Sequence, residues 1–95
     1  MGLNSSLASK IYTKAFTFKV QINANSNKWY GQNEWDISVA GYKAIGVIGY
    51  YAPSAFLNIY SMRVISNGTI SVAIRNEASN AVDDNMELYI LYLKN

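Results

Sequence analysis

The sequence predicts an all-β protein, an antiparallel β-sandwich or jelly-roll-like fold that is trimeric in its working state. Four segments have the apolar pattern of strands: Ala15–Ile22, Leu57–Ile65, Thr69–Ile74 and Met86–Leu93. Turn-forming residues recur about every ten positions, and no segment repeats its apolar residues at the helical period. A chain of 95 residues fits one domain. We therefore expect residues 1–9 to form an N-terminal arm or stalk remnant, and residues 10–95 to form a single β-sandwich domain.

The first strand is apolar on one face only, because polar residues separate Phe16, Phe18, Val20 and Ile22. The polar cluster 23–28 predicts an exposed loop that leads into Trp29 and Tyr30. Glu34 to Val39 predicts a short strand with alternate residues on one buried face: Trp35, Ile37 and Val39.

Two pairs of residues predict local backbone features. Gly46 and Gly49 interrupt a β-branched run, so we expect a bulge, a bend or a close approach of another backbone or ring there. Asn67 and Gly68 join the strand Leu57–Ile65 to the strand that begins at Thr69 as a hairpin, since both residues accept the positive φ of a type I′ turn. The strand that follows this turn should place Ile70, Val72 and Ile74 inward, with Thr69, Ser71, Ala73 and Arg75 outward.

The final strand is apolar on both faces. One face carries Met86, Leu88, Ile90 and Tyr92, and the opposite face carries Tyr89, Leu91 and Leu93. Only 15% of the residues are charged, against about 25% in an average soluble domain. We therefore expect one face of this strand in the core of the monomer, and the other face under a second sheet or under copies of the same chain.

The composition excludes several classes of function. The chain has no Cys and no His, which removes disulfides, the usual structural zinc sites, thiol nucleophiles and the histidine base of a serine nucleophile. We expect no metal and no cofactor. The net charge of +2 comes from scattered basic residues, so nucleic acid is not an expected partner. No apolar run approaches the ~20 residues of a membrane span, so we expect no membrane insertion.

Two groups of acidic residues offer chemistry that we rank below a structural role. Glu34 and Asp36 share one strand face at roughly 6.6 Å, a separation that suits an inverting glycosidase. We favour a solvated strand face over this pair, because no sequence feature indicates a cleft or a raised carboxyl pKa. Asp83, Asp84 and Asn85 lack the spacing of a calcium loop and are typical of a solvated turn. The prediction is that the protein is not an enzyme, so no residue is expected to be catalytic.

The aromatic residues give the positive evidence for binding. Trp29 and Tyr30 lie beside the amide of Asn27, an arrangement that can stack on a sugar ring while amides bind its hydroxyl groups. Tyr50 and Tyr51 form a similar pair. Neighbouring residues of a strand face opposite sides, so at most one residue of each pair can be buried in the same layer. Four other aromatic side chains are expected in the core: Phe16, Phe18, Trp35 and Tyr60.

The segments Gly41–Tyr50, Asn58–Tyr60, Ile70–Asn76 and Leu88–Lys94 together resemble the C-terminal tip module of bacteriophage fibre and receptor-binding proteins. The likeness covers about half of the chain. It implies a β-sandwich head that forms parallel homotrimers at the end of a stalk, in the virion, and recognises a host cell-surface saccharide or protein.

The residues and the resemblance together lead to one expected function and two alternatives. We expect a non-enzymatic phage fibre or tail-tip domain that recognises a host-surface receptor, most simply a saccharide, through Asn27, Trp29, Tyr30, Tyr50 and Tyr51. The trimer axis is expected at Tyr89, Leu91 and Leu93. The first alternative is a purely structural module for virion assembly or decoration, without a ligand. The second is a glycan-cleaving enzyme that uses Glu34 and Asp36.

Overall fold

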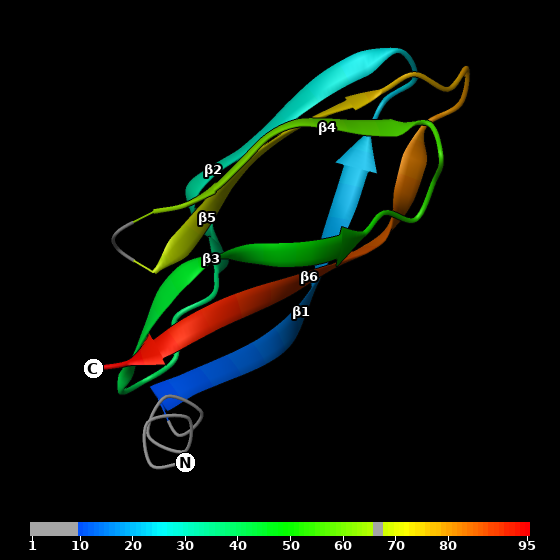
Figure 1. Ribbon diagram of the computed structural model, residues 1–95. Helices are drawn as coiled ribbons and strands as arrows, with labels where there is room; N and C mark the ends of the chain where they lie inside the picture. The colour runs from blue at the N-terminus through cyan, green and yellow to red at the C-terminus, as the bar shows by residue number, and fades with distance from the viewer. Residues whose placement is uncertain (1–9, 66–67) are drawn as a thin grey trace.

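The computed structural model describes residues 10–65 and 68–95, and all of its elements there are β-strands. The strands are β1 (Ile11–Ile22), β2 (Ser26–Asp36), β3 (Tyr42–Tyr51), β4 (Leu57–Val64), β5 (Thr69–Asn76) and β6 (Val82–Lys94). The first sheet has the order β1-β6-β3 and the second sheet the order β2-β5-β4, with every pair antiparallel. The two sheets form two packed layers (Figure 1), which confirms the predicted β-sandwich. No helix within the described ranges could span a membrane.

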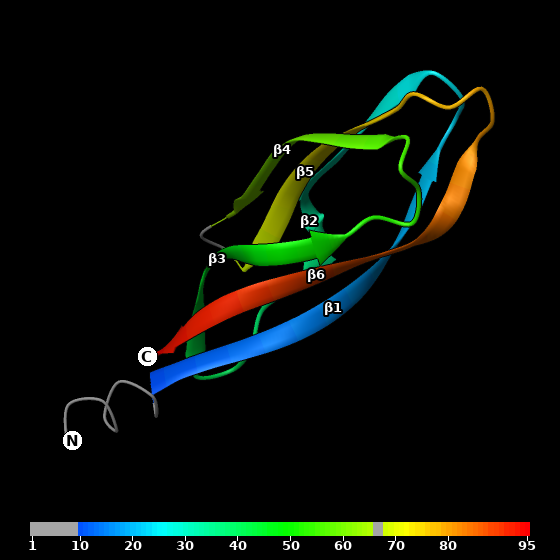
Figure 2. The same cartoon turned by 45° about the vertical axis from the view of Figure 1, so that its right-hand side comes forward.

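The chain alternates between the two layers. Of the five connections, only the one between β4 and β5 joins strands of the same sheet. Figure 2 shows that β3 and β4 lie on the same side of the sandwich, with β6 and β5 as the central strands of their sheets. Ile11, the first residue of β1, pairs with Leu93 near the end of β6. The start of β1 and the end of β6 therefore lie at the same end of the sandwich. Because each sheet has three strands, its outer face carries side chains from three strands.

The core lies between the central strands. The predicted inward residues of β6 (Met86, Leu88, Ile90 and Tyr92) are fully buried, as are those of β5 (Ile70, Val72 and Ile74). The end of β1 adds Val20 and Ile22 to the same cluster. The predicted inward faces of these three strands are therefore confirmed.

The outward residues of β5 differ from a simple alternation of buried and exposed positions. Thr69, Ser71 and Ala73 face away from the core but are also buried. These side chains are small, and β5 lies between two neighbouring strands whose longer side chains cover it. A central position in the sheet therefore buries both faces of β5.

The predicted loop 23–28 is confirmed for residues 23–25 and wrong for residues 26–28. The turn is confined to the residues around Asn25, which has a positive φ of 51°, and β2 begins at Ser26. Asn27 and Lys28 pair with Arg75 and Ile74 of β5. Polar residues fit here because β2 is an edge strand, and their ladder hydrogen bonds outweigh their weak strand preference. Of the predicted strand 34–39, residues 34–36 are the end of this same strand, after an irregularity between Tyr30 and Trp35, and residues 37–39 lie outside any strand.

The glycines of β3 are explained as predicted. The register of β3 against β6 shifts between Ala44 and Gly46 and again between Val47 and Gly49. A Cβ atom at Gly49 would lie 3.6 Å from the ring of Tyr89. Gly49 thus combines a bulge with the close approach of an aromatic ring.

The hairpin between β4 and β5 forms where the sequence predicts it. Gly68 has a φ of +86°, its N–H donates to the carbonyl of Ile65 at 3.0 Å, and the N–H of Ile65 donates to the carbonyl of Thr69 at 2.8 Å. A Cβ atom at Gly68 would lie 3.0 Å from Cβ of Ser38. The predicted turn residue Asn67 and the predicted arm 1–9 lie outside the described residues.

An aromatic stack closes the side of the sandwich between β1 and β2. The ring centroids of Phe18 and Trp35 lie 4.7 Å apart, and those of Trp35 and Tyr30 lie 4.5 Å apart. Phe16 stacks on Phe18 from the other side. Three of the four aromatic side chains predicted for the core are therefore in or against it. The prediction for Tyr60 is wrong, because this side chain is 56% exposed.

A single buried amide joins the loops at one end of the sandwich. The Nδ2 atom of Asn76 lies within hydrogen-bonding distance of the carbonyl oxygens of Ile22, Asn23 and Asn80, at 2.9–3.2 Å. Its Oδ1 atom accepts the N–H of Ala78 at 2.9 Å. The side chain is fully buried. Asn76 therefore holds the β1–β2 turn and the β5–β6 loop together.

We expect Asn76→Ala to lower the free energy of unfolding by about 2–3 kcal/mol, because the carbonyl groups would stay buried without a donor. Urea unfolding of the variant and the parent measures this. Asn58→Ala, at an exposed position of β4, is the matched control and should change stability by less than about 0.5 kcal/mol. Equal effects of the two substitutions would contradict the assigned role of Asn76.

The hydroxyl group of Tyr92 joins β6 to the segment after β2. It donates a hydrogen bond to the carbonyl oxygen of Ile37, and the side chain is fully buried. Burial is the main cause that raises the pKa of Tyr92 to about 12, and the negative charges that Tyr12 and Asp36 can carry add to it. The neutral phenol is thus the form that the fold requires.

We expect stability to fall as the pH rises from about 10 to about 12, because the unfolded chain ionises Tyr92 at its ordinary pKa while the folded chain retains the proton. Below pH 10 both the folded and the unfolded chain keep the Tyr92 proton, so the neutral phenol makes its full contribution to the free energy of unfolding. Urea unfolding from pH 8 to pH 12 measures it. The other tyrosines also ionise in this range, so Tyr92→Phe is the control: its stability should fall less steeply than that of the parent. Parallel curves would contradict this role of Tyr92.

Candidate functional site

Trp29 lies on the outer face of the second sheet, and most of its indole is open to solvent. It belongs to β2 and pairs in register with Ala73 of β5. Trp29 points outward because its neighbour Tyr30 points into the core. The side chain is 65% exposed, the largest exposed fraction among the large hydrophobic residues described.

The indole of Trp29 is held in place from two sides. Its Nε1 atom donates a hydrogen bond to Oγ of Ser71 on β5 at 2.8 Å. Its six-membered ring packs over Gly31, where a Cβ atom would lie 3.4 Å from Cζ2. The ring is thus fixed along the sheet surface before any ligand arrives, which lowers the entropy that binding would cost.

Tyr30 is not part of this surface. Its side chain is buried, its ring stacks on Trp35, and its hydroxyl oxygen accepts the backbone N–H of Gln21 at 3.0 Å. Gln21 is on the edge strand β1, so this hydrogen bond satisfies a donor at the edge of the first sheet. As predicted, one residue of this aromatic pair is buried; it is Tyr30, which therefore cannot stack on an external ring.

Asn27 lies two residues before Trp29 and shares its face. Its Oδ1 atom accepts a hydrogen bond from Nη1 of Arg75 at 3.0 Å. The Nε atom of Arg75 lies 3.3 Å from a carboxylate oxygen of Glu77. Asn27, Arg75 and Glu77 therefore form an ordered group of hydrogen-bonding side chains next to the exposed indole.

Tyr50 and Tyr51 do not join the site around Trp29. They end β3 in the first sheet, where Tyr51 pairs with Glu87 on the sheet face that is turned away from the second sheet. Both are exposed, at 52% and 61%. Neither is buried, which agrees with the limit that at most one residue of the pair can be buried, and β3 is an edge strand of its sheet.

The structure adds Tyr60 to the outer face of the second sheet. A bulge in β4 lies between Ile59 and Ser61. Ile59 and Met62 both pack against the core, so alternation counted from either side places Tyr60 and Ser61 outward. The Trp29 face thus comprises Asn27, Trp29, Asn58, Tyr60, Ser61, Arg63, Ser71, Ala73 and Arg75. The outward position of Tyr60 could not be predicted from the sequence, because a bulge leaves no pattern in the β4 residues.

The outer face of the first sheet is different in character. Tyr89, Leu91 and Leu93, predicted at a trimer axis, lie on it together, and Tyr89 and Leu93 are exposed in the single chain. Ile11 and Ala15 of β1 and Ile48 of β3 flank them. We name these six residues the apolar face. They form the surface that the two-sided pattern of the last strand predicts.

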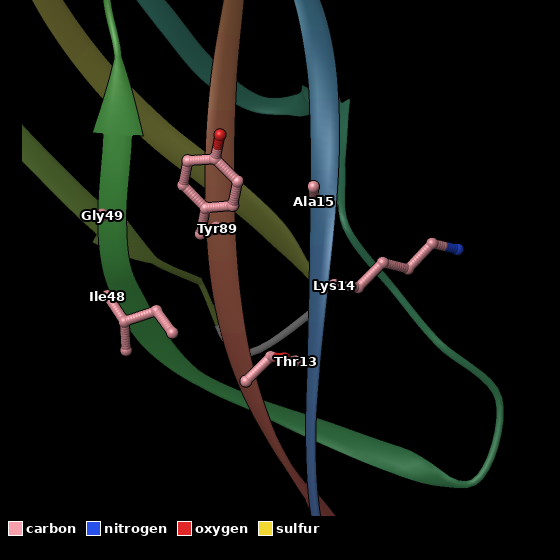
Figure 3. A pocket seen from close by; sticks show the side chains of 6 residues that line it. All are labelled: Thr13, Lys14, Ala15, Ile48, Gly49 and Tyr89. Atoms are coloured by element: carbon pink, nitrogen blue, oxygen red, sulfur yellow. The ribbon is translucent and has the colours of Figure 1, made fainter.

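A groove runs beside Tyr89 on the apolar face. Figure 3 shows the Tyr89 ring between Ala15 on β1 and Ile48 and Gly49 on β3, while the Lys14 side chain points away. The groove has a volume of about 400 Å³. It exists because Ala15 and Gly49 are small on both sides of a large ring. The Tyr89 hydroxyl donates to a Glu87 carboxylate oxygen at 2.8 Å, and this hydrogen bond raises the pKa of Tyr89.

Glu34 and Asp36 are occupied by local backbone contacts. The Glu34 carboxylate accepts the N–H of Gly31 at 3.0 Å, and Asp36 accepts the hydroxyl and the N–H of Ser38 at 2.7 and 2.9 Å. The hydrogen bonds from Ser38 lower the pKa of Asp36. A general acid needs the opposite shift.

Asp83 also has partners within the fold. It accepts a hydrogen bond from Gln21 at 3.1 Å and lies 3.2 Å from Nζ of Lys19, and both contacts lower the pKa of Asp83. No cluster of three potential metal ligands occurs in residues 10–65 and 68–95.

The chain was compared with known proteins at three levels. No protein-family model, curated protein sequence or solved structure matches it. The functional argument therefore rests on the two outer faces of the sandwich.

Proposed function

We propose that this domain is a non-enzymatic receptor-binding module that recognises a saccharide through Trp29. The observation that carries the proposal is the exposed indole fixed by Ser71 and Gly31. The exposed C–H face of a pyranose ring stacks on such an indole, and neighbouring amide and guanidinium groups bind its hydroxyls. Asn27 and Arg75 supply these groups next to Trp29.

The biological setting that we propose is the head of a bacteriophage fibre or tail tip. The resemblance of the segments between Gly41 and Lys94 to such modules supports this setting. We propose in addition that three copies of the chain assemble, with Tyr89, Leu91 and Leu93 at the axis. The apolar face supports assembly, because exposed apolar side chains that share one sheet face gain free energy when a copy covers them.

The alternative, a purely structural virion module, has one observation in its favour. The apolar face alone would serve assembly, and it needs no ligand. The two functions differ in what they require of Trp29, since a structural module does not need an exposed indole on its second sheet.

We expect Trp29→Ala to weaken saccharide binding by at least about tenfold, which corresponds to about 1.4 kcal/mol. Screening on a glycan array identifies ligands, and calorimetry measures their affinity for each variant. Tyr51→Ala, an equally exposed aromatic position on the other sheet, is the control and should bind like the parent. Failure of the parent to bind any glycan would support the structural alternative, whereas equal glycan binding by Trp29→Ala would contradict the assignment of the site to Trp29.

We expect Leu93→Lys to convert the assembly into monomers, because like charges would meet at the axis and lose hydration there. Light scattering over a range of concentrations gives the molar mass of each form. Trp29→Ala lies on the opposite sheet and should keep the mass of the parent. A parent that stays monomeric at all concentrations would refute the trimer, and the saccharide proposal would then stand without it.

A further inference from the structure

The Trp29 face contains a second exposed aromatic side chain in the same row of residues. Trp29 and Ser61 both pair in register with Ala73, one from each side. Tyr60 is the bulge residue next to Ser61, and it is exposed. The two rings therefore belong to the two edge strands of one sheet, at the same level along its strands.

The space between the two rings is shallow. Neighbouring strands lie about 4.8 Å apart, so β2 and β4 are separated by about 10 Å across β5. Only the methyl group of Ala73 lies between them, and it is buried. The backbones of the two strands are thus separated by about the length of two linked pyranose rings, and the Trp29 indole extends from β2 over β5 toward Ser71. A compact monosaccharide on Trp29 would leave Tyr60 unused.

Polar side chains border this aromatic row on both sides. On one side, Arg75 pairs in register with Asn27 on β2 and with Asn58 on β4. On the other side, Arg63 pairs with Ser71. On β4 the order is thus polar, aromatic and polar; on β2 Asn27 precedes Trp29, and on β5 Arg75 and Ser71 lie on either side of Ala73. A chain of sugars has the matching pattern, since its ring faces are apolar and its edges carry hydroxyl groups.

We propose that the ligand is a linear oligosaccharide of at least two hexose units, which lies across β2, β5 and β4 and stacks on both Trp29 and Tyr60. The inference rests on the saccharide-binding function proposed above and specifies its ligand class. The face favours a glycan over a protein partner because its aromatic rings are separated and surrounded by amides, hydroxyls and guanidinium groups, without a continuous apolar patch. The outward residues of β5 at this level, Ser71 and Ala73, are small and buried, so the ligand would rest on the exposed rings of Trp29 and Tyr60 and not on β5 itself.

The test is a length series on Trp29 and Tyr60 variants. Gluco-, galacto-, manno- and N-acetylglucosamine oligosaccharides of one to six units are immobilised, and the best series is then measured by calorimetry. We expect the parent to bind units of three or more at least about tenfold more tightly than the monosaccharide, the effect of one additional aromatic contact. Tyr60→Ala should remove this gain and leave the affinity for the monosaccharide within about twofold.

Three controls separate the outcomes. Tyr60→Phe should retain the gain with length, because stacking needs the ring and not the hydroxyl. Tyr51→Ala should bind every length like the parent. Thermal unfolding of each variant establishes that it is folded.

Each result decides the question. If Trp29→Ala loses binding but the affinity of the parent does not rise with oligosaccharide length, the proposal that the ligand stacks on both Trp29 and Tyr60 is wrong while the proposed function stands. The same conclusion follows if Tyr60→Ala behaves like the parent. If the parent binds no member of any series, both fail. Binding of the Trp29 face to a host-surface protein, with no glycan bound, would also overturn both.

Discussion

The contact between β6 and β5 is the interaction on which the rest of the structure depends. The chain crosses from one sheet to the other at four of its five connections, so no sheet forms from a continuous stretch of sequence. The sheets are joined by the fully buried inward side chains of the two central strands, and each large apolar side chain contributes about 1.5–3 kcal/mol by burial. The four edge strands pair with these two central strands. Weakening this contact would therefore affect both sheets at once.

The same arrangement leaves two outer faces with different chemistry. The first sheet carries the apolar face, bordered by Lys43 beside Leu93 and by Glu87 beside Tyr89, whereas the second sheet presents polar side chains around two exposed aromatic rings. Because the layers lie back to back, a partner on one face cannot obstruct the other. This geometry allows self-association and ligand binding in one small domain, and it explains why we assign the two proposed roles to different sheets.

Polar contacts fix the ends of the sandwich more than its middle. The Asn76 side chain joins two loops at one end, and the hydroxyl of Tyr92 bonds the segment after β2 near the other. Both groups are buried and satisfied, and no buried side-chain polar atom is left unpaired among the residues described. Such contacts add specificity because their loss leaves a buried carbonyl without a donor. They position the strand ends, and thereby the register that places Trp29 opposite Ala73.

The sequence by itself determined the fold class, the inward faces of β1, β5 and β6, the irregularities at Gly46 and Gly49, and the turn that ends at Gly68. Each of these follows from short-range patterns: alternation along a strand, or a backbone conformation that glycine permits. Only the tertiary structure decided that residues 26–28 belong to β2, that Tyr30 is buried while Tyr50 and Tyr51 are exposed, and that Tyr60 faces outward. The reason is that strand order, edge position and bulges depend on which distant strand supplies the hydrogen bonds, and a local pattern carries no information about that partner.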